Sequence, residues 1–287
     1  MLPILLDLKF IKIYTFGVFL VLALFWGAFL LWKNIRLTSY KEEDVFDSLF
    51  MSLGFGLLVG RIVHVILNFD KFGFDILKFL LINGYPGLSL YGCVAGFFAG
   101  LALYTVSRRM KFLEVVDYFI SPLLFSIALG KLGGFFSGVE VGSKTKYPLA
   151  IKYAGLDGAR NLTSLYESIL FFLAAYIAYR LLFAIRRQIY TRGFNFYFFW
   201  WALSFIYFFF DPLKSTHTAF AHYKSVNSFF SLTLLLTFTF YFLYYFRGLL
   251  LGKSEVVRSS LISYGQKIRS SASGKIKRGE GENPQSN

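Results

Sequence analysis

The sequence has few of the charged residues that soluble domains need and few of the cysteines and histidines that metalloproteins use. Its 287 residues include one cysteine and three histidines, and only 16% are charged. The single thiol, Cys93, excludes an internal disulfide and a thiolate metal cluster, and the chain has no His, Asp and Glu spacing typical of a zinc or di-iron site. Since an average soluble domain is roughly a quarter charged residues, too little polar surface is available for a soluble fold. We expect no metal and no other cofactor.

Apolar residues, in contrast, are abundant. They make up 56% of the chain, aromatics make up 21%, and the mean hydropathy is +0.56. Seven windows of about twenty residues carry few charges, and each is long enough to cross about 30 Å of hydrocarbon as an α-helix. The predicted spans are 14–32, 45–67, 88–106, 115–136, 165–185, 194–210 and 226–246. The predicted fold is an all-α, polytopic membrane helix bundle.

The formal charge of +14 does not indicate a nucleic-acid partner, because the basic residues are spread between apolar spans. They are concentrated in alternate connections and in the carboxyl-terminal tail. The clustered residues are Lys33, Arg36, Lys41, Arg108, Arg109, Lys111, Arg180, Arg186, Arg187 and Arg192. By the positive-inside rule these connections are cytoplasmic. The amino terminus is then predicted outside the cytoplasm and the carboxyl terminus inside it.

Composition also predicts the domain organisation. No long Pro, Gly or Ser linker divides the spans, so residues 1–252 are predicted to form one transmembrane domain. Residues 253–287 are basic, rich in Ser and Gly, and too poor in apolar residues to fold alone. They are predicted to form a disordered cytoplasmic tail.

Glycines recur every four residues in three places and so line one face of a helix. The three sets are Gly56 and Gly60; Gly92, Gly96 and Gly100; and Gly130, Gly134, Gly138 and Gly142. Stripes of small residues let helix backbones approach closely, and they are the usual packing motif of membrane bundles. Taken alone, they predict helix packing rather than chemistry.

Six polar residues are predicted to share one depth near the outer ends of the spans. Arg61 follows about sixteen residues of its span, which places it about 24 Å along the helix, and Lys131 has the same depth. The other four are His64, Tyr91, Tyr166 and Glu167. Each could snorkel separately to the interface, but their common level favours a site for an anionic lipid head group, with the cations facing phosphate.

Three further ionisable residues fall within a turn or two of predicted cytoplasmic ends: Asp47, Asp117 and Arg180. At that depth snorkelling or simple solvation explains them. We expect them to be solvated.

Three segments carry a resemblance to a known family. Residues 60–65, the loop 68–87 and residues 88–92 are similar in order and spacing to a Gly-Arg-(Ile/Leu)-Gly-Tyr-Val segment, an outer loop and Ser-Phe-His-Gly-Gly. Residues 130–142 are similar to Gly-Arg-Ile-Gly-Asn-Phe-Ile-Asn-Gly-Glu-x-x-Gly, and residues 164–167 to Ser-Gln-Leu-Tyr-Glu. With seven predicted spans, the chain resembles the prolipoprotein diacylglyceryl transferases from about residue 14 to residue 246.

The resemblance implies a function and a set of site residues. The expected reaction moves the diacylglyceryl group of phosphatidylglycerol to the lipobox cysteine thiol of a preprolipoprotein signal peptide, at a bacterial cytoplasmic membrane. Tyr91, Lys131 and His64 are the expected catalytic residues, with the identity of the base open between His64 and Tyr91. The expected substrate-binding residues are Arg61, Gly133, Gly134, Ser137, Gly138, Glu140, Tyr166 and Glu167.

This chain departs from the family pattern at charged positions. Tyr91 stands where the family has histidine, Lys131 where it has arginine, and Glu140 one position after the expected glutamate. Gly134 and Ser137 replace two asparagines. In the sixth span, a family tyrosine, arginine, glutamate and arginine align with Trp200, Ser204, Phe208 and Asp211, so that half of the charged site is predicted to be missing.

Two alternatives to transfer remain open at this point. A relative that binds phospholipid or signal peptides without catalysis is favoured by the changed charges of the sixth span. Against it, Arg61 and Lys131 are costly to keep in a membrane without a partner. For His64, the alternative to a role as the base is an aromatic side chain that lies at the membrane interface near a helix end. A transporter ranks last, because the chain has no repeats or interrupted helix pairs near mid-membrane.

Overall fold

A computed structural model describes residues 3–8, 11–81, 84–85, 87–146, 148, 150–153, 157–215 and 226–247. The chain divides into two compact units, Met1–Leu236 and Thr237–Asn287. In the second unit, the described residues are the end of one helix, where the Tyr241 ring lies against Phe242 and Tyr245. The predicted tail, 253–287, lies outside the described residues and stays a prediction.

Seven helices among the described residues are long and apolar enough to cross a membrane, which confirms the predicted number. They are α1 (Thr15–Ile35), α2 (Glu42–Leu67), α5 (Leu90–Ser107), α6 (Phe112–Ser137), α7 (Thr163–Arg186), α8 (Phe194–Phe210) and α9 (Val226–Tyr245). Several run a few residues beyond the apolar windows. The first turn of α2, for example, contains Glu42, Glu43 and Asp44, because acidic side chains are favourable at the positive end of a helix dipole.

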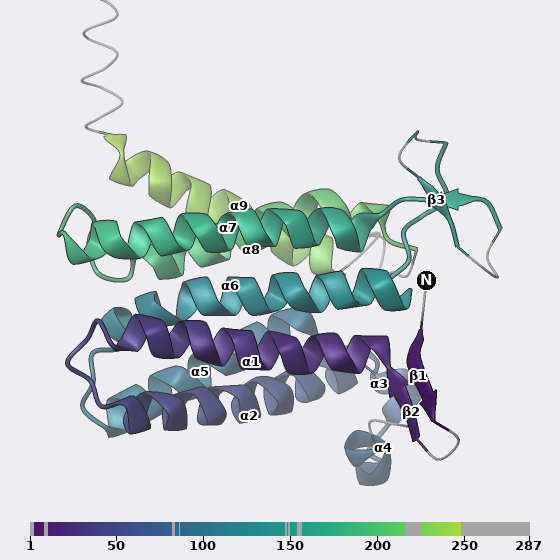
Figure 1. Cartoon of the computed structure of the whole chain (residues 1–287), viewed down its shortest axis with the longest axis horizontal. Helices are drawn as coiled ribbons and strands as arrows, with labels where there is room; N and C mark the ends of the chain where they lie inside the picture. Colours follow the sequence, from purple (N-terminus) through teal and green to yellow (C-terminus); the bar gives the residue numbers. More distant parts are fainter. Residues whose placement is uncertain are drawn as a thin grey trace, which may run out of the picture. The chain divides into compact units, whose positions relative to one another are not determined.

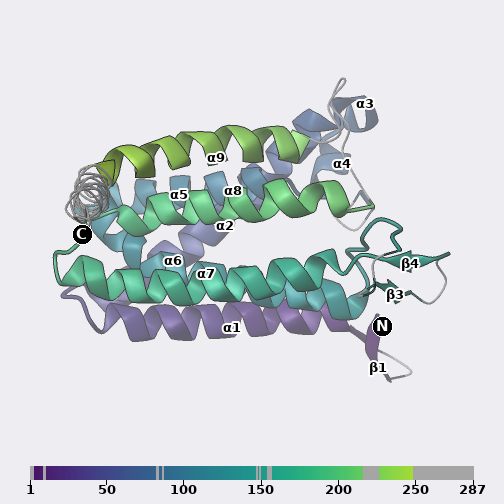
Figure 2. The ribbon, with the colours of Figure 1, turned by 90° about the horizontal axis from the view of Figure 1, so that it is seen from above.

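Short elements join the long helices. Strands β1 (Ile4–Leu8) and β2 (Ile11–Tyr14) form an antiparallel hairpin before α1, and β3 (Ile151–Lys152) pairs with β4 (Ala159–Arg160). The α2–α5 connection contains α3 (Phe69–Phe72) and α4 (Ile76–Leu80). The 3₁₀ turn η1 (Asp211–Leu213) follows α8. These strands were not predicted from the sequence, since each has five residues or fewer. Figures 1 and 2 show β1, α3, α4 and β3 at the same end of the helices.

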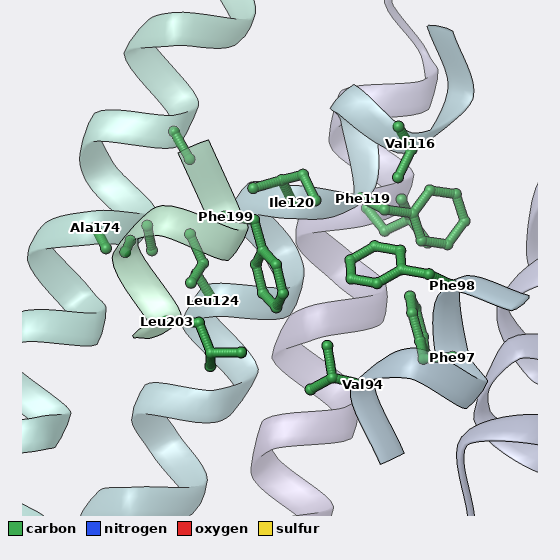
Figure 3. Packing of buried hydrophobic residues seen from close by; sticks show 14 of the residues in the cluster. Val94, Phe97, Phe98, Val116, Phe119, Ile120, Leu124, Ala174, Phe199 and Leu203 are labelled. Atoms are coloured by element: carbon green, nitrogen blue, oxygen red, sulfur yellow. The ribbon is translucent and has the colours of Figure 1, made fainter. Parts of the chain in front are cut away.

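The core of the first unit centres on α6, which packs against both α1 and α7. Aromatic side chains from α5, α6 and α8 pack together in it (Figure 3): Phe97 lies 6.2 Å from Phe119 between ring centroids, and Phe98 lies 5.2 Å from Phe199. Phe119 and Phe199 are at most 2% exposed. This core holds α6 rigidly and so fixes the polar residues at its two ends.

The glycine stripe of α5 has the role predicted for it. A Cβ added at Gly96 would lie 2.5 Å from the Phe55 carbonyl oxygen, and one at Gly100 would lie 2.8 Å from the Phe55 Cβ. A Cβ at Gly60 would overlap the sulfur of Cys93. Because real side chains do not tolerate such distances, the small residues are what allow α2 and α5 to pack backbone to backbone.

Membrane orientation gives the first testable prediction. The α5–α6 and α7–α8 connections, which contain Arg109 and Arg192, lie at the end of the helices opposite to β3 (Figure 1). Reporter fusions after Arg109 and Arg192 should read cytoplasmic, and a fusion at Lys152 in β3 should read external. A cytoplasmic reading at Lys152 would reverse the orientation and move the site described below to the other leaflet.

Candidate functional site

Four charged side chains meet where α6 and α7 approach the end that contains β3. The Lys131 ammonium nitrogen lies 2.8 Å from Oε1 and 2.7 Å from Oε2 of Glu140, and 2.9 Å from Oε2 of Glu167. Oε1 of Glu167 lies 2.7 Å from the Lys214 ammonium nitrogen. Lys131, Glu140, Glu167 and Lys214, called here the Lys131 cluster, therefore form a continuous chain of ion pairs.

The end of α6 brings Glu140 back to Lys131. Gly138 ends the helix with φ +73°, in the left-handed region that glycine adopts without strain. The buried Ser137 hydroxyl is bonded within this turn, 3.3 Å from the Gly134 carbonyl oxygen. After the turn, the Ser164 hydroxyl donates to Oε2 of Glu140 at 3.1 Å. Glu140, which follows Lys131 by nine residues, is thus brought back into contact with it.

Gly133 and Gly134 differ in their surroundings, and substrate binding by them stays a prediction. A Cβ at Gly133 would lie 2.4 Å from Cβ of Phe19, so this glycine lets α6 approach α1. A Cβ at Gly134 would meet the Glu140 side chain at 3.8 Å, an ordinary contact. Gly133 therefore sets the position of the helix, and Gly134 leaves space beside the carboxylate.

Main-chain pairing delivers Lys214 to the cluster. Ser143 N–H donates to the Leu213 carbonyl at 2.8 Å, and Ser215 N–H donates to the Val141 carbonyl at 3.1 Å. The segment after α8 is thereby tied to the loop that carries Glu140. The segment that follows the sixth span therefore contributes a cation to the cluster, while the prediction that charged family positions within the span are missing stays a prediction. That cation is Lys214, three residues beyond Asp211.

Three of the four side chains in the cluster are largely buried, and the cluster has no net formal charge. The side chains of Glu167, Lys131 and Lys214 are 0%, 11% and 13% exposed. Both ammonium groups lie over the ring of the buried Tyr207, at 5.3 Å for Lys131 and 4.6 Å for Lys214. Two lysines and two glutamates cancel in formal charge, which lowers the cost of keeping them out of water. An added anion must therefore compete with a carboxylate.

Glu140 is the most accessible member of the cluster, since its side chain is 38% exposed. Burial raises its pKa, but the Lys131 and Lys214 ammonium groups and the hydrogen bonds from Lys131 and Ser164 outweigh burial and lower the pKa to about 2. The carboxylate therefore stays ionised at neutral pH. Among the four charged groups, it is the one best placed to move away when a ligand arrives.

This lowered pKa predicts a pH dependence of stability. A group whose pKa falls on folding stabilises the protein above its unfolded pKa, near 4.5, and this contribution is lost as the pH drops toward 2. The difference in melting temperature between the parent protein and Glu140→Gln should be constant from about pH 6 to 8 and shrink below about pH 4. Thermal unfolding in detergent across this range measures it. A difference that does not change with pH would contradict the ion pair.

Tyr91 and Tyr166 both pack against aromatic side chains of α8. The Tyr91 hydroxyl is hydrogen-bonded to the Ser231 hydroxyl of α9, and its ring lies 6.3 Å from that of Tyr207. The Tyr166 ring lies 6.0 Å from that of Phe210. The Tyr91 ring thus packs beside the ring that both ammonium groups cover, whereas Tyr166 packs against the end of α8.

Arg61 and His64 have other contacts. The Arg61 guanidinium donates to four main-chain carbonyls: those of Lys78 at 2.8 Å, Phe79 at 3.0 Å, Tyr85 at 2.8 Å and Gly87 at 2.9 Å. Arg61 is 3% exposed, and the His64 ring lies beside Phe72 and Gly87. The six residues predicted at one depth therefore separate into the cluster side and a pair that holds the α2–α5 loop. Phosphate binding by Arg61 stays a prediction, with one of its five N–H donors left for it.

Of the three residues expected to be solvated, one is not. Asp117 is 1% exposed, and its carboxylate accepts hydrogen bonds from Gly193 N–H at 2.6 Å and Asn195 N–H at 3.1 Å. The expectation is wrong for this residue, because the start of α8 folds onto α6 and uses Asp117 as its cap. Asp47 and Arg180 are exposed, as expected.

An apolar cavity of about 460 Å³ adjoins the Lys131 cluster. Most of its wall consists of aliphatic and aromatic side chains from α1, α2, α5 and α6, and Lys131, Glu140 and Tyr207 also line it. Leu20 and Leu24 of α1 belong to the wall and are 48% and 49% exposed, so the cavity extends to the surface of α1. The cavity has the polarity of an amphiphile: apolar along its length and charged at one place.

Sequence reasoning missed Lys214 and Tyr207. The signal for Lys214 was its place just after the sixth span. Tyr207 was not selected because it is one of many aromatic residues in α8. Among the described residues, no group of three or more His, Cys, Asp and Glu side chains is placed to hold a metal ion.

Seven membrane-length helices with a charged cluster beside an apolar cavity define a multi-pass membrane protein suited to an amphiphilic ligand. Comparison with known proteins identifies its family: the model described as "Prolipoprotein diacylglyceryl transferase" matches residues 3–244. The chain belongs to this family.

Individual relatives are similar at low identity. Phosphatidylglycerol–prolipoprotein diacylglyceryl transferase of Clostridium tetani (strain Massachusetts / E88) is 26% identical over 181 residues, which cover 61% of this chain and 71% of the relative. The protein of the same name from Clostridioides difficile (strain 630) is 28% identical over 161 residues, covering 55% and 63%. That from Finegoldia magna is 26% identical over 174 residues, covering 58% and 68%.

Proposed function

We propose that this protein transfers the diacylglyceryl group of phosphatidylglycerol to the lipobox cysteine thiol of prolipoproteins. The names of its relatives state these two substrates. The observation that carries the proposal is the Lys131 cluster beside an apolar cavity, since a phospholipid needs both an apolar volume and a partner for its phosphate. The proposed location is a bacterial cytoplasmic membrane, with the cluster at the outer leaflet.

The proposed reaction breaks one bond and forms one. The cysteine sulfur attacks the glyceryl carbon of the lipid, a C–S bond forms, and the C–O bond to the phosphate breaks, releasing glycerol phosphate. The thiol, with a pKa of about 8.5, must lose its proton, and the departing phosphate gains negative charge. A cation held in place before the reaction stabilises that charge without reorganisation.

Residue roles follow from position. Lys131 and Lys214 are the proposed cations for phosphate, with Lys131 lining the cavity and Lys214 joined to it through Glu167. Tyr91 is the proposed hydroxyl near the reacting atoms. Glu140 is the proposed mobile carboxylate: once phosphate takes its place on Lys131, its pKa would rise toward the ordinary range and make it a better proton acceptor.

A second function is favoured by one observation, the electrical balance of the cluster. Because both lysines already face carboxylates, phosphate binding must displace an existing ion pair. A protein that binds phospholipid or signal peptides without transfer would tolerate such a site more easily than an enzyme. This alternative predicts lipid binding with no product.

One experiment separates the two functions. Purified protein is incubated with phosphatidylglycerol labelled in its acyl chains and a lipobox peptide, and a matched peptide with serine in place of cysteine serves as control. Thioether-linked lipid on the cysteine peptide alone, with release of glycerol phosphate, is the expected result. Saturable lipid binding without thioether product would overturn transfer and leave the binding function.

A further inference from the structure

A second cavity, of about 490 Å³, lies at the other end of α6 from the Lys131 cluster. Its wall includes Glu114, Asp117 and Tyr118 of α6, Arg186 at the end of α7, and the α7–α8 turn. Asp117 and Lys131 are fourteen residues apart on one helix, or about 21 Å. We propose that this cavity binds a phosphate-bearing anion, namely the head group of an anionic phospholipid in the leaflet opposite to the Lys131 cluster.

The acidic residues of the cavity are already bound. The Asp117 carboxylate accepts the main-chain N–H groups of Gly193 and Asn195. Glu114 Oε2 lies 2.9 Å from a guanidinium nitrogen of Arg192. Each carboxylate is therefore held by donors of the protein itself, and their combined repulsion toward an incoming anion is reduced.

Arg186 is the cation that remains available. In the described part of the chain, no carboxylate lies within ion-pair distance of its guanidinium, and its side chain is exposed at the cavity wall. The Tyr118 hydroxyl lies within electrostatic range of Arg186, and the Gln188 amide lies on the same wall. A guanidinium fork with neutral donors beside it matches the oxygen geometry of a phosphate.

The rest of the wall favours a lipid as the source of the phosphate. Leu182, Ile185 and Ile189 also line the cavity, and Ile189 is 62% exposed. These apolar side chains, next to a cation at a membrane-helix end, suit a molecule whose acyl chains begin just below its phosphate. In the predicted orientation this end faces the cytoplasmic leaflet, where basic residues attract anionic lipid.

A fluorescence titration tests the proposal at the cavity itself. In a Cys93→Ser background, an environment-sensitive label is attached to Thr191→Cys, since Thr191 is exposed and lines the cavity. Short-chain phosphatidylglycerol should give a saturable signal, and phosphatidylcholine a much weaker one. Arg186→Gln should weaken phosphatidylglycerol binding about ten-fold, the value of one charge-assisted contact.

Arg187→Gln is the matched control, because it removes the same charge from the adjacent exposed residue, which does not line the cavity. It should change the affinity by less than about two-fold. Equal effects of the two substitutions, equal binding of the two lipids, or no saturable signal would overturn the site. An equal response to inorganic phosphate would keep the anion site and assign it to free phosphate. Lys131→Gln should leave this titration unchanged, so failure here is distinguishable from failure of the proposed transfer function.

Discussion

Lys131→Gln should lower diacylglyceryl transfer by a factor of about ten or more, since a desolvated charge contact contributes roughly 1.5 to 3 kcal/mol. Lys131 lines the apolar cavity and touches both Glu140 and Glu167. Its removal takes away the proposed phosphate partner, leaves Glu140 without an ion-pair partner among the described residues and leaves Glu167 with Lys214 alone. Transfer to the lipobox peptide and phosphatidylglycerol binding are measured on the same purified variant.

The two measurements distinguish the role of the charge. Transfer lost with binding intact marks a cation that acts on the departing phosphate, and loss of both marks a head-group anchor. Lys131→Arg is the matched variant, because it keeps the charge and offers phosphate two parallel hydrogen bonds, so it should retain or improve function. If Lys131→Gln transfers and binds lipid as the parent does, the Lys131 cluster is not the functional site.

Glu167→Gln should have the largest effect on stability. Glu167 is fully buried, and its two oxygens face different lysines, Lys131 at 2.9 Å and Lys214 at 2.7 Å. Removing one partner of a buried ion pair costs about 3 to 5 kcal/mol, because the remaining charge is left uncompensated. We expect a clear fall in the melting temperature in detergent, together with lower yield of folded protein.

A second substitution tests whether the loss comes from the lone lysine. In the described residues, Glu167 is the one carboxylate within ion-pair distance of Lys214, so Lys214→Gln combined with Glu167→Gln should recover part of the stability. Glu140→Gln is the matched control, since its exposed side chain is easier to replace and its loss should be smaller. Simple additivity of the Lys214 and Glu167 substitutions would show that the pair is not coupled.

The residues of α5 and α6 show how far sequence reasoning reached at the site. The Gly92, Gly96 and Gly100 stripe predicted close helix packing, and α2 lies against it. Lys131 and Glu167 were both selected as intramembrane charges, and they form an ion pair. These inferences rest on position along a helix, which a regular rise per residue makes predictable.

The partners of Arg61 and Asp117 could not be predicted in the same way. Both residues were judged by depth, yet Arg61 bonds the carbonyls of a loop and Asp117 caps α8. Depth along a helix does not say which way a side chain points or which loop folds over it. Contacts between residues far apart in sequence decide that, and the sequence alone does not list them.

The sequence alone determined the number of spans, the scarcity of polar residues that a soluble fold would need, and the likeness to the transferase family. Each of these depends on composition or on spacing within a window of about twenty residues. Tertiary structure alone decided that Glu140 turns back to Lys131, that Lys214 arrives beside Glu167, and that a cavity adjoins them. The reason is physical. Burying a charge is costly without an opposite charge, so partners are found wherever the packed helices and their loops bring them together.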